Sequence, residues 1–383
     1  MKNLYYRYAA LYNFSYMAIG ALVPLIGQYL QYMGFNGTQI GIITSTGTCV
    51  AIFASAFWGT IYNRSCKKHE IIIILCMTAS AICFVLKEID IFVAFAVIFG
   101  IMYFFQAPVM SLTDAFTVQS GYGFGGLRAW GALGFSLGTF LTGIIVDIFG
   151  MSLMFWIYSG SFLISSLIIY TVKKKSSLKI NKNECDKKAK RSYYKLLQNK
   201  RLRNLIICAF FWGGTNVANN TYFSFLYVEG GGTVAGVGIA MLLMVGSEVP
   251  FMTWCEKLSS KFTMEKIVLA AMIISSARFI FFGMGLPWWG LILLSFTQGA
   301  VNGILLIEFV RYSAKLASDE YKSLAVSAYY VIGSNLSTIL CQIIGGIILD
   351  CCGATGVYMF FGVFNLCGVI LYIGFRLNKT VSD

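Results

Sequence analysis

Residues 91–118 form the stretch that sets the architecture of this chain, IFVAFAVIFGIMYFFQAPVMSLTDAFTV. The run is 28 residues long, and Asp114 is its only charged residue. A helix needs about 20 apolar residues to cross the roughly 30 Å hydrocarbon core of a bilayer. We therefore interpret this stretch as a membrane-spanning helix.

Comparable stretches occur along the whole chain. In the first half, the predicted spans are 8–32, 39–62, 69–87, 91–118, 126–148 and 151–172. In the second half, they are 203–228, 234–255, 264–285, 288–312, 322–349 and 354–376. The sequence therefore predicts an all-α membrane protein with twelve transmembrane helices in two pseudo-symmetric six-helix bundles.

The overall composition agrees with this interpretation. Of the 383 residues, 58% are apolar and 12% are charged, whereas about a quarter of the residues of a soluble domain are charged. A water-soluble globule, a disulfide scaffold and a nucleic-acid-binding protein are therefore excluded together.

Positive charge is concentrated between the two sets of spans. Thirteen Lys or Arg residues lie within 173–203, against Glu184 and Asp186, so this segment does not cross a bilayer. If the spans alternate in direction, the positive-inside rule places this segment and both termini in the cytoplasm. We predict an N-terminal six-helix bundle, a basic cytoplasmic linker and a C-terminal six-helix bundle at 1–172, 173–202 and 203–383.

Two short segments near the ends of the fifth and eleventh spans resemble each other. LTGIIVD at 141–147 matches IGGIILD at 344–350, shifted by 203 positions. The match favours one duplicated six-helix unit. Duplicated halves, with the substrate site between them near the bilayer midplane, are the plan of secondary transporters, so the architecture indicates transport.

Ionisable residues inside the predicted spans are the first candidates for function, because a charge at the bilayer centre costs at least ~2.5–3.5 kcal/mol on insertion scales. Asp114 in the fourth span and Arg128 in the fifth form one acid and base set across the glycine-rich turn at 121–126. Glu248 in the eighth span and Arg278 near the middle of the ninth form a second set. The alternative for each set is a salt bridge that only holds helices together.

Uncharged polar residues extend the candidate substrate site. Amides in three spans suit hydroxyl-rich or heterocyclic ligands: Asn13, Asn216, Asn220, Gln298 and Asn302. Trp130 offers a ring on which a sugar or an aromatic ligand can stack. For each of these residues the alternative is ordinary helix packing. Glu308 and Arg311, spaced i, i+3 near the cytoplasmic interface, are interpreted as a structural pair.

Coupling to protons requires carboxylates in this chain. The only histidine, His69, lies in an inner loop, and the eleven cysteines are scattered without a CxxC pair. The sequence therefore predicts neither a histidine relay nor a metal site. We expect Asp114, Glu248 and Arg278 to serve proton coupling, with the proton as coupling ion and no cofactor. No Walker loop, HExxH pair or nucleophile and base constellation indicates an enzyme.

Six short motifs share their order and spacing with a known family: APVMSLTDA at 107–115, YG at 122–123, LRAWG at 127–131, GSEV at 246–249, SAR at 276–278 and RY at 311–312. They resemble the major facilitator superfamily, in particular the branch that contains lactose permease and the bacterial phenylpropionate permease. The resemblance implies that Asp114 and Arg128 take the places of the sugar-site acid and the essential arginine. It also implies that Glu248 and Arg278 take the places of the second acid and arginine.

The chain departs from the family pattern at two places. The loop after the second span usually carries an aspartate after its glycine, whereas GTIYNR at 59–64 has Asn63. In the tenth span the histidine and glutamate of the lactose permease proton path are absent, and Gln298 and Asn302 lie in that neighbourhood. We therefore assign proton coupling to Glu248 rather than to the tenth span.

Together these observations predict a proton-coupled symporter of the cytoplasmic (inner) membrane. We expect it to import a small sugar, nucleoside or aromatic acid by alternating access, and to act as a monomer in contact only with its substrate and the lipid bilayer. Two balanced sets favour a neutral ligand, whereas an unpaired Arg128 favours a carboxylate. Two alternatives stay open: an exporter of drugs or metabolites with the same fold, and a membrane sensor that does not transport.

Overall fold

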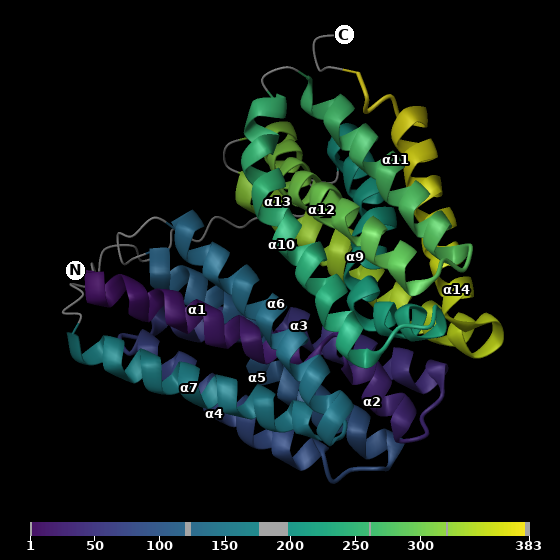
Figure 1. The fold of residues 1–383 in the computed structure, drawn as a ribbon. Coiled ribbons are helices and arrows are strands. Elements are labelled where there is room, and N and C mark those ends of the chain that lie inside the picture. The colour runs from purple at the N-terminus through teal and green to yellow at the C-terminus, as the bar shows by residue number, and fades with distance from the viewer. Residues whose placement is uncertain (1, 119–123, 176–197, 260–261, 319–320, 380–383) are drawn as a thin grey trace. The chain divides into compact units, whose positions relative to one another are not determined.

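A computed structural model shows an almost entirely helical protein (Figure 1). No strand occurs in the part of the chain that the structure describes, which comprises residues 2–118, 124–175, 198–259, 262–318 and 321–379.

The chain divides into two compact units. Unit 1 comprises Met1–Glu184 and Thr233–Leu242, and unit 2 comprises Cys185–Gly232 and Leu243–Asp383. Most of the predicted linker at 173–202 lies outside the described residues. The domain boundaries predicted from the sequence therefore stay a prediction.

The helices of unit 1 follow the predicted spans. The first span is divided between α1 (Lys2–Leu22) and α2 (Ile26–Tyr32), because Pro24 lacks an amide hydrogen and interrupts the helix. Asn36 begins α3 with a capping box, in which its side chain accepts from the Gln39 amide at 2.8 Å and its amide donates to the Gln39 side chain at 3.0 Å. The helices that follow are α3 (Gly37–Arg64), α4 (Lys68–Leu86), α5 (Phe92–Val118), α6 (Phe124–Phe149) and α7 (Leu153–Lys175).

Helices α1 and α6 approach so closely that glycine is required at their contact. A Cβ atom on Gly20 would lie 2.1 Å from the Phe135 carbonyl oxygen. A Cβ atom on Gly134 would lie 2.1 Å from the Asn13 carbonyl oxygen. Small residues permit this kind of approach between membrane helices. The contact fixes the first half of α6 against the middle of α1.

Unit 2 contains the helices of the second half, apart from the first residues of α10. These helices are α9 (Lys200–Glu229), α10 (Val234–Ser259), α11 (Met264–Gly283), α12 (Trp288–Leu316), α13 (Lys322–Ala328), the π-helix η2 (Tyr329–Leu336) and α14 (Ser337–Gly374). Helix α14 is interrupted at Gly353, whose φ of +70° favours glycine. The Glu229 side chain accepts a hydrogen bond from the Ala354 amide at 2.8 Å and so caps the helix that resumes there.

Nine helices within the described ranges are long and apolar enough to cross a membrane. One of them, Leu324–Gly374, contains the last two predicted spans on either side of Gly353. Helix α10 contributes a shorter apolar segment, Val234–Glu248. Helix α9 falls outside the nine, since its middle is rich in asparagine. With α9 and α10 included, the helices occupy all twelve predicted spans.

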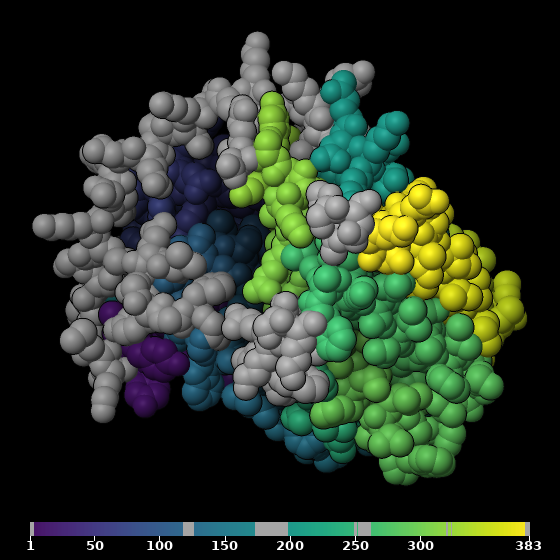
Figure 2. Space-filling model, turned by 90° about the horizontal axis from the view of Figure 1, so that it is seen from above, coloured from purple at the N-terminus to yellow at the C-terminus, as the bar shows by residue number. Residues whose placement is uncertain are grey.

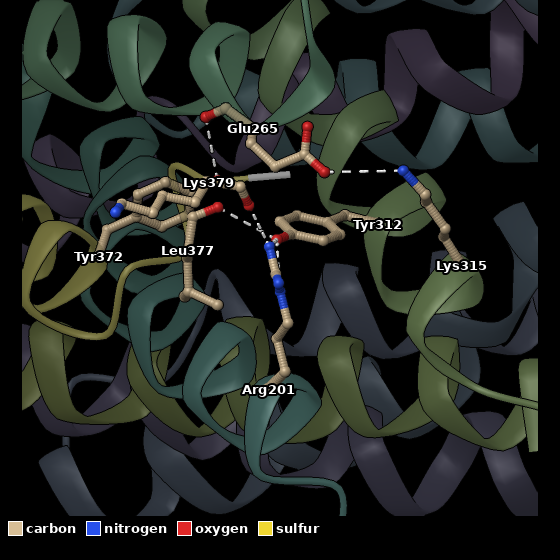
Figure 3. A network of polar contacts seen from close by, with 7 residues as sticks. All are labelled: Arg201, Glu265, Tyr312, Lys315, Tyr372, Leu377 and Lys379. Atoms are coloured by element: carbon tan, nitrogen blue, oxygen red, sulfur yellow. Dashed lines mark hydrogen bonds and ion pairs between the residues drawn. The ribbon is translucent and has the colours of Figure 1, made fainter. Parts of the chain in front are cut away.

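At one end of unit 2, the last described residues (yellow) lie beside the start of α9 (teal), as Figure 2 shows. Polar contacts join them (Figure 3). Arg201 donates hydrogen bonds to the Tyr312 hydroxyl at 3.0 and 3.2 Å and to the Lys379 carbonyl. The Tyr312 hydroxyl donates to the Leu377 carbonyl at 3.2 Å. The chain after α14 is thereby held against α9 and α12.

Candidate functional site

Asp114 and Arg128 form an ion pair in unit 1. Asp114 lies near the end of α5 and Arg128 near the start of α6, and Nη1 of Arg128 is 2.5 Å from Oδ2 of Asp114. The Asp114 and Arg128 side chains are 27% and 47% exposed. The structure therefore brings the first predicted set together and leaves both side chains partly accessible.

Two tyrosines of α1 complete the surroundings of this pair. The Tyr12 hydroxyl donates a hydrogen bond to Oδ1 of Asp114 at 2.8 Å. The Arg128 guanidinium lies over the Tyr16 ring, 5.2 Å from its centroid, a favourable cation–π arrangement. The two tyrosines are one helical turn apart and their rings stack with 6.2 Å between centroids. Tyr12 is a site residue that was not identified from the sequence, although the i, i+4 spacing of two tyrosines in a predicted span was a usable signal.

Asn13 and Trp130, both predicted site residues, also lie at the contact between α1 and α6. The Asn13 side-chain amide donates to the Trp130 carbonyl at 3.4 Å. The Trp130 side chain is 38% exposed. Trp130 thus contributes its main chain to the contact, and its ring stays partly accessible.

Carboxylate and amide side chains meet in unit 2. The Asn302 side-chain amide of α12 donates to Oε1 of Glu248 on α10 at 2.8 Å. One turn earlier on α12, the Gln298 side-chain amide donates to Oδ1 of Asn216 on α9 at 2.7 Å. The carbonyl oxygens of the Gln298 and Asn302 side chains are buried and have no hydrogen-bond partner in the described part of the chain. Four of the predicted residues are thereby joined in two pairs from three helices.

Arg278 lies apart from Glu248 in the described part of unit 2. It belongs to the last third of α11, rather than to the middle of its span as predicted, and it is 3% exposed. Its guanidinium carbon lies 4.4 Å from the centroid of the Phe279 ring and 5.8 Å from that of Phe282. Its Nε and Nη1 atoms have no hydrogen-bond partner among the described residues. The Arg278 guanidinium therefore packs against aromatic rings of its own helix, and the second predicted set does not form an ion pair among the described residues.

The asparagines of α9 lie on different faces of the helix. Asn219 is buried and accepts a hydrogen bond from the Tyr358 hydroxyl at 2.7 Å, so it holds α9 against α14. Asn220, a predicted substrate residue, is half-buried and forms no hydrogen bond with described residues. Of the two predicted asparagines of α9, Asn216 therefore joins the polar group and Asn220 does not.

Glu308 and Arg311, predicted to form a structural pair, lie near the end of α12. Nη1 of Arg311 lies 3.3 Å from the buried Glu308 carboxylate on the same helix, which confirms the predicted pairing. Across the described ranges, no three His, Cys, Asp or Glu residues are grouped to hold a metal ion. The polar groups of each unit can instead donate to and accept from ligand hydroxyls.

Comparisons with known proteins identify the family and the fold of this chain. The family described as MFS_1 like family matches residues 5–360. Maltose permease of Geobacillus stearothermophilus is 27% identical over 372 residues, which are 94% of this chain and 92% of the permease. Sucrose permease of Escherichia coli is 27% identical over 171 residues, 41% of each chain. The crystal structure of the nucleoside transporter NupG is similar in fold, with a TM-score of 0.84 and 17% identity over 98% of this chain and 99% of that one.

Proposed function

This chain belongs to the MFS_1 like family, and from that premise we propose that it imports a neutral, hydroxyl-rich solute, a sugar or a nucleoside, together with protons. The resemblance to the major facilitator superfamily is confirmed by the family match, and the protein is a secondary transporter rather than an enzyme. Its location in the cytoplasmic membrane with both termini inside the cell, and its action as a monomer by alternating access, belong to the proposal.

The ion pair of Asp114 and Arg128 is the observation that carries the assignment of a neutral ligand. The pair has no net charge, and both side chains are partly exposed. A ligand carboxylate that binds the remaining donors of Arg128 comes close to the negative charge of Asp114, which repels it. A ligand hydroxyl can donate to Asp114 and accept from Arg128 without separating them. A polyol therefore gains hydrogen bonds here and leaves no charge unpaired.

The amides of unit 2 suit the same class of ligand. The unpartnered side-chain oxygens of Gln298 and Asn302 lie one helical turn apart on α12. Buried acceptors of this kind need a donor, which a sugar hydroxyl or a nucleobase N–H supplies. The related maltose and sucrose permeases, and the structurally similar NupG, are named for solutes with such groups.

For proton coupling we assign the main role to Glu248 and a second role to Asp114. Asn302, a neutral amide, holds the Glu248 carboxylate and has both a donor and an acceptor, so it can pair with the ionised and the protonated acid. Arg278 lies in the same unit without an acidic partner among the described residues. An approach of its positive charge to Glu248 during transport favours release of the proton.

Counterflow exchange in proteoliposomes tests the neutral-ligand assignment. Vesicles loaded with unlabelled maltose, sucrose, uridine or phenylpropionate are diluted into the same solute in labelled form. We expect exchange of a neutral solute and none of the acid. Asp114→Asn and Arg128→Lys should each slow this exchange at least about tenfold, or about 1.4 kcal/mol, because Asn lacks the negative charge of the pair and Lys lacks the planar fork of donors. Arg311→Lys is the matched control, since its pair with Glu308 is assigned to structure.

Other outcomes identify the alternatives. Exchange of phenylpropionate alone would overturn the neutral-ligand assignment. Net outward movement of amphipathic dyes, measured in a deletion strain, would favour an exporter. A solute that raises the melting temperature of the purified protein but is never exchanged would favour a sensor.

A further inference from the structure

Unit 1 contains a group of buried hydroxyls next to Asp114, which we name the hydroxyl cluster: Tyr12, Tyr62, Thr113 and Thr117. Tyr12 lies on α1, Tyr62 in the last turn of α3, and the two threonines in the last turns of α5. Each of the four side chains is at most 1% exposed. Because α1 starts at the end of the unit where α3 and α5 finish, the cluster lies towards the end of unit 1 that is predicted to face the cytoplasm.

Three members of the cluster have hydroxyls that the protein does not satisfy. Elsewhere in the described helices, threonines such as Thr44, Thr60 and Thr139 donate to a carbonyl of their own helix at 2.9 to 3.1 Å. Thr113 and Thr117 have no such bond, and neither does the hydroxyl of Tyr62 among the described residues. Buried hydroxyls are usually paired with protein groups or with ordered water. Since these three hydroxyls form no hydrogen bond of ordinary geometry with a protein group, we infer that ordered water lies beside them.

The cluster continues from Asp114 to the surface. The Tyr12 hydroxyl donates to Asp114 at 2.8 Å and lies beside Thr117. The ring of Tyr8, one turn before Tyr12, contacts Phe116 on α5 at 5.8 Å between centroids. Tyr62 lies close enough to Tyr8 for their hydroxyls to interact electrostatically.

The far end of the cluster lies at the start of α4. The Lys68 ammonium, in the first turn of α4, is 5.3 Å from the centroid of the Tyr62 ring. Lys68 follows the short connection after α3 and is only half-buried. Tyr62 therefore lies directly beneath the surface of the unit, and Tyr8 is the residue that relates it to the Tyr12 end of the cluster.

We propose that the hydroxyl cluster holds ordered water and conducts protons between Asp114 and the predicted cytoplasmic surface of unit 1. Each hydroxyl or water accepts one proton and passes on another, so none of them changes its charge. A proton that leaves Asp114 restores the carboxylate that pairs with Arg128. This path rests on the proposed function, in which transport is coupled to protons.

Few charged or titratable groups of the described residues face the two ends of the proposed proton path, Asp114 and Tyr62. Arg128 faces Asp114 from α6, and Tyr12 and Tyr16 face it from α1. At the other end, Tyr8 and Lys68 face Tyr62. Variants that test the pH dependence of transport should therefore keep Arg128 and these tyrosines. A change in that dependence can then be attributed to the substituted hydroxyls.

Radiolytic hydroxyl-radical labelling tests the hydration of the cluster without any solute. Radicals formed from ordered water label buried side chains next to that water. Tyr62 is expected to react several-fold faster than Tyr158, which is also fully buried in unit 1 but donates to the Gln106 side chain at 2.7 Å. Equal labelling of Tyr62 and Tyr158 in the purified full chain would overturn the proposal.

Transport by matched variants tests the proton path. The double variant Thr113→Val with Thr117→Val keeps the shape of both side chains and removes their hydroxyls. We expect it to retain counterflow exchange, which needs no net proton movement, and to lose most of the accumulation driven by a pH gradient. Thr142→Val is the control, because Thr142 is equally buried and also unpartnered but belongs to α6 outside the cluster.

The outcomes separate this inference from the proposed function. Wild-type protein that exchanges none of the solutes contradicts the proposed function, while the labelling of Tyr62 still decides whether the cluster is hydrated. Wild-type accumulation driven by sodium instead of a pH gradient overturns the proton path. Unchanged pH-driven accumulation in the Thr113→Val, Thr117→Val variant overturns it as well. A folding defect of that variant appears as lost exchange, in which case Tyr62→Phe with the same two measurements decides the question.

Discussion

Replacing Gly134 with alanine is expected to force α1 and α6 apart. The added Cβ would lie 2.1 Å from the carbonyl oxygen of Asn13 and 2.7 Å from its Cα. Ordinary contacts between such atoms begin at about 3.5 Å, so the two backbones have to separate by roughly 1 Å or more. Because both neighbouring atoms belong to the main chain, no side-chain rotation relieves the clash.

The size of the effect follows from the rigidity of this contact. Overpacking of a close-packed interior typically lowers the free energy of unfolding by about 1–3 kcal/mol, and an immovable main-chain neighbour favours the upper part of that range. Alanine recovers roughly 0.5–1 kcal/mol of helix propensity relative to glycine. We therefore expect a net loss of about 2 kcal/mol. Unit 1 is in the size range of about 150–250 residues, for which 1 kcal/mol shifts the melting temperature by about 2–4 °C. The expected loss therefore lowers the melting temperature by roughly 4–8 °C.

Tryptophan fluorescence of the purified protein during heating measures this change. Gly160→Ala is the matched control, because Gly160 is also inside a helix of unit 1 and a Cβ atom added there would have nothing within 4 Å. We expect Gly160→Ala to leave the melting temperature unchanged or to raise it slightly. A Gly134→Ala protein as stable as Gly160→Ala would refute the close packing of α1 on α6. Solute exchange should fall in parallel, since the same contact aligns Tyr16 with Arg128.

Three further predictions concern unit 2. Arg201→Ala should lower the free energy of unfolding by about 1.5–3 kcal/mol, because Arg201 holds the segment after α14 against α9 and α12 by hydrogen bonds. Arg203→Ala is the control, because Arg203 is exposed, and it should leave the melting temperature nearly unchanged. Glu229→Ala should cost about 1 kcal/mol by removing the cap at the interruption of α14, and Glu229→Gln, which keeps an acceptor, should recover most of it in the same assay. Lys315→Met should destabilise the protein at neutral pH, since it removes the cation 3.6 Å from the buried Glu265 carboxylate, and the loss should shrink in the Glu265→Gln background. Equal melting temperatures of the Lys315→Met and wild-type proteins would contradict the last prediction.

The helices were largely predictable from the sequence. The interruption of the first span at Pro24 and that of the last helix at Gly353 follow from the backbone limits of proline and glycine, which act locally. Helix α9 was also predicted from the sequence, although its asparagines lower its hydropathy and it is not among the nine helices that are apolar enough to cross a membrane. The π-helical segment Tyr329–Leu336 had no sequence signal, because its hydrogen-bond register depends on packing against neighbouring helices.

The candidate site was predictable to different degrees in the two units. Asp114 and Arg128 lie near the end of α5 and the start of α6, two helices that follow each other in the sequence, so their proximity could be predicted from their positions. Glu248 and Arg278 are separated by the last part of α10 and most of α11, and a small rotation of either helix changes what its side chain contacts. In the structure, the Arg278 guanidinium lies over Phe279 and Phe282 of its own helix and forms no ion pair with Glu248.

From residue order alone, one can establish that this protein is a membrane protein with twelve spans, since hydropathy and helix length are properties of each segment by itself. Charge placement adds a predicted orientation for the same reason. Tertiary structure alone determined which polar groups form hydrogen bonds with each other: Tyr12 with Asp114, Asn302 with Glu248, and Gln298 with Asn216. Such partnerships depend on the rotation and spacing of packed helices, which are set by contacts between residues far apart in the chain.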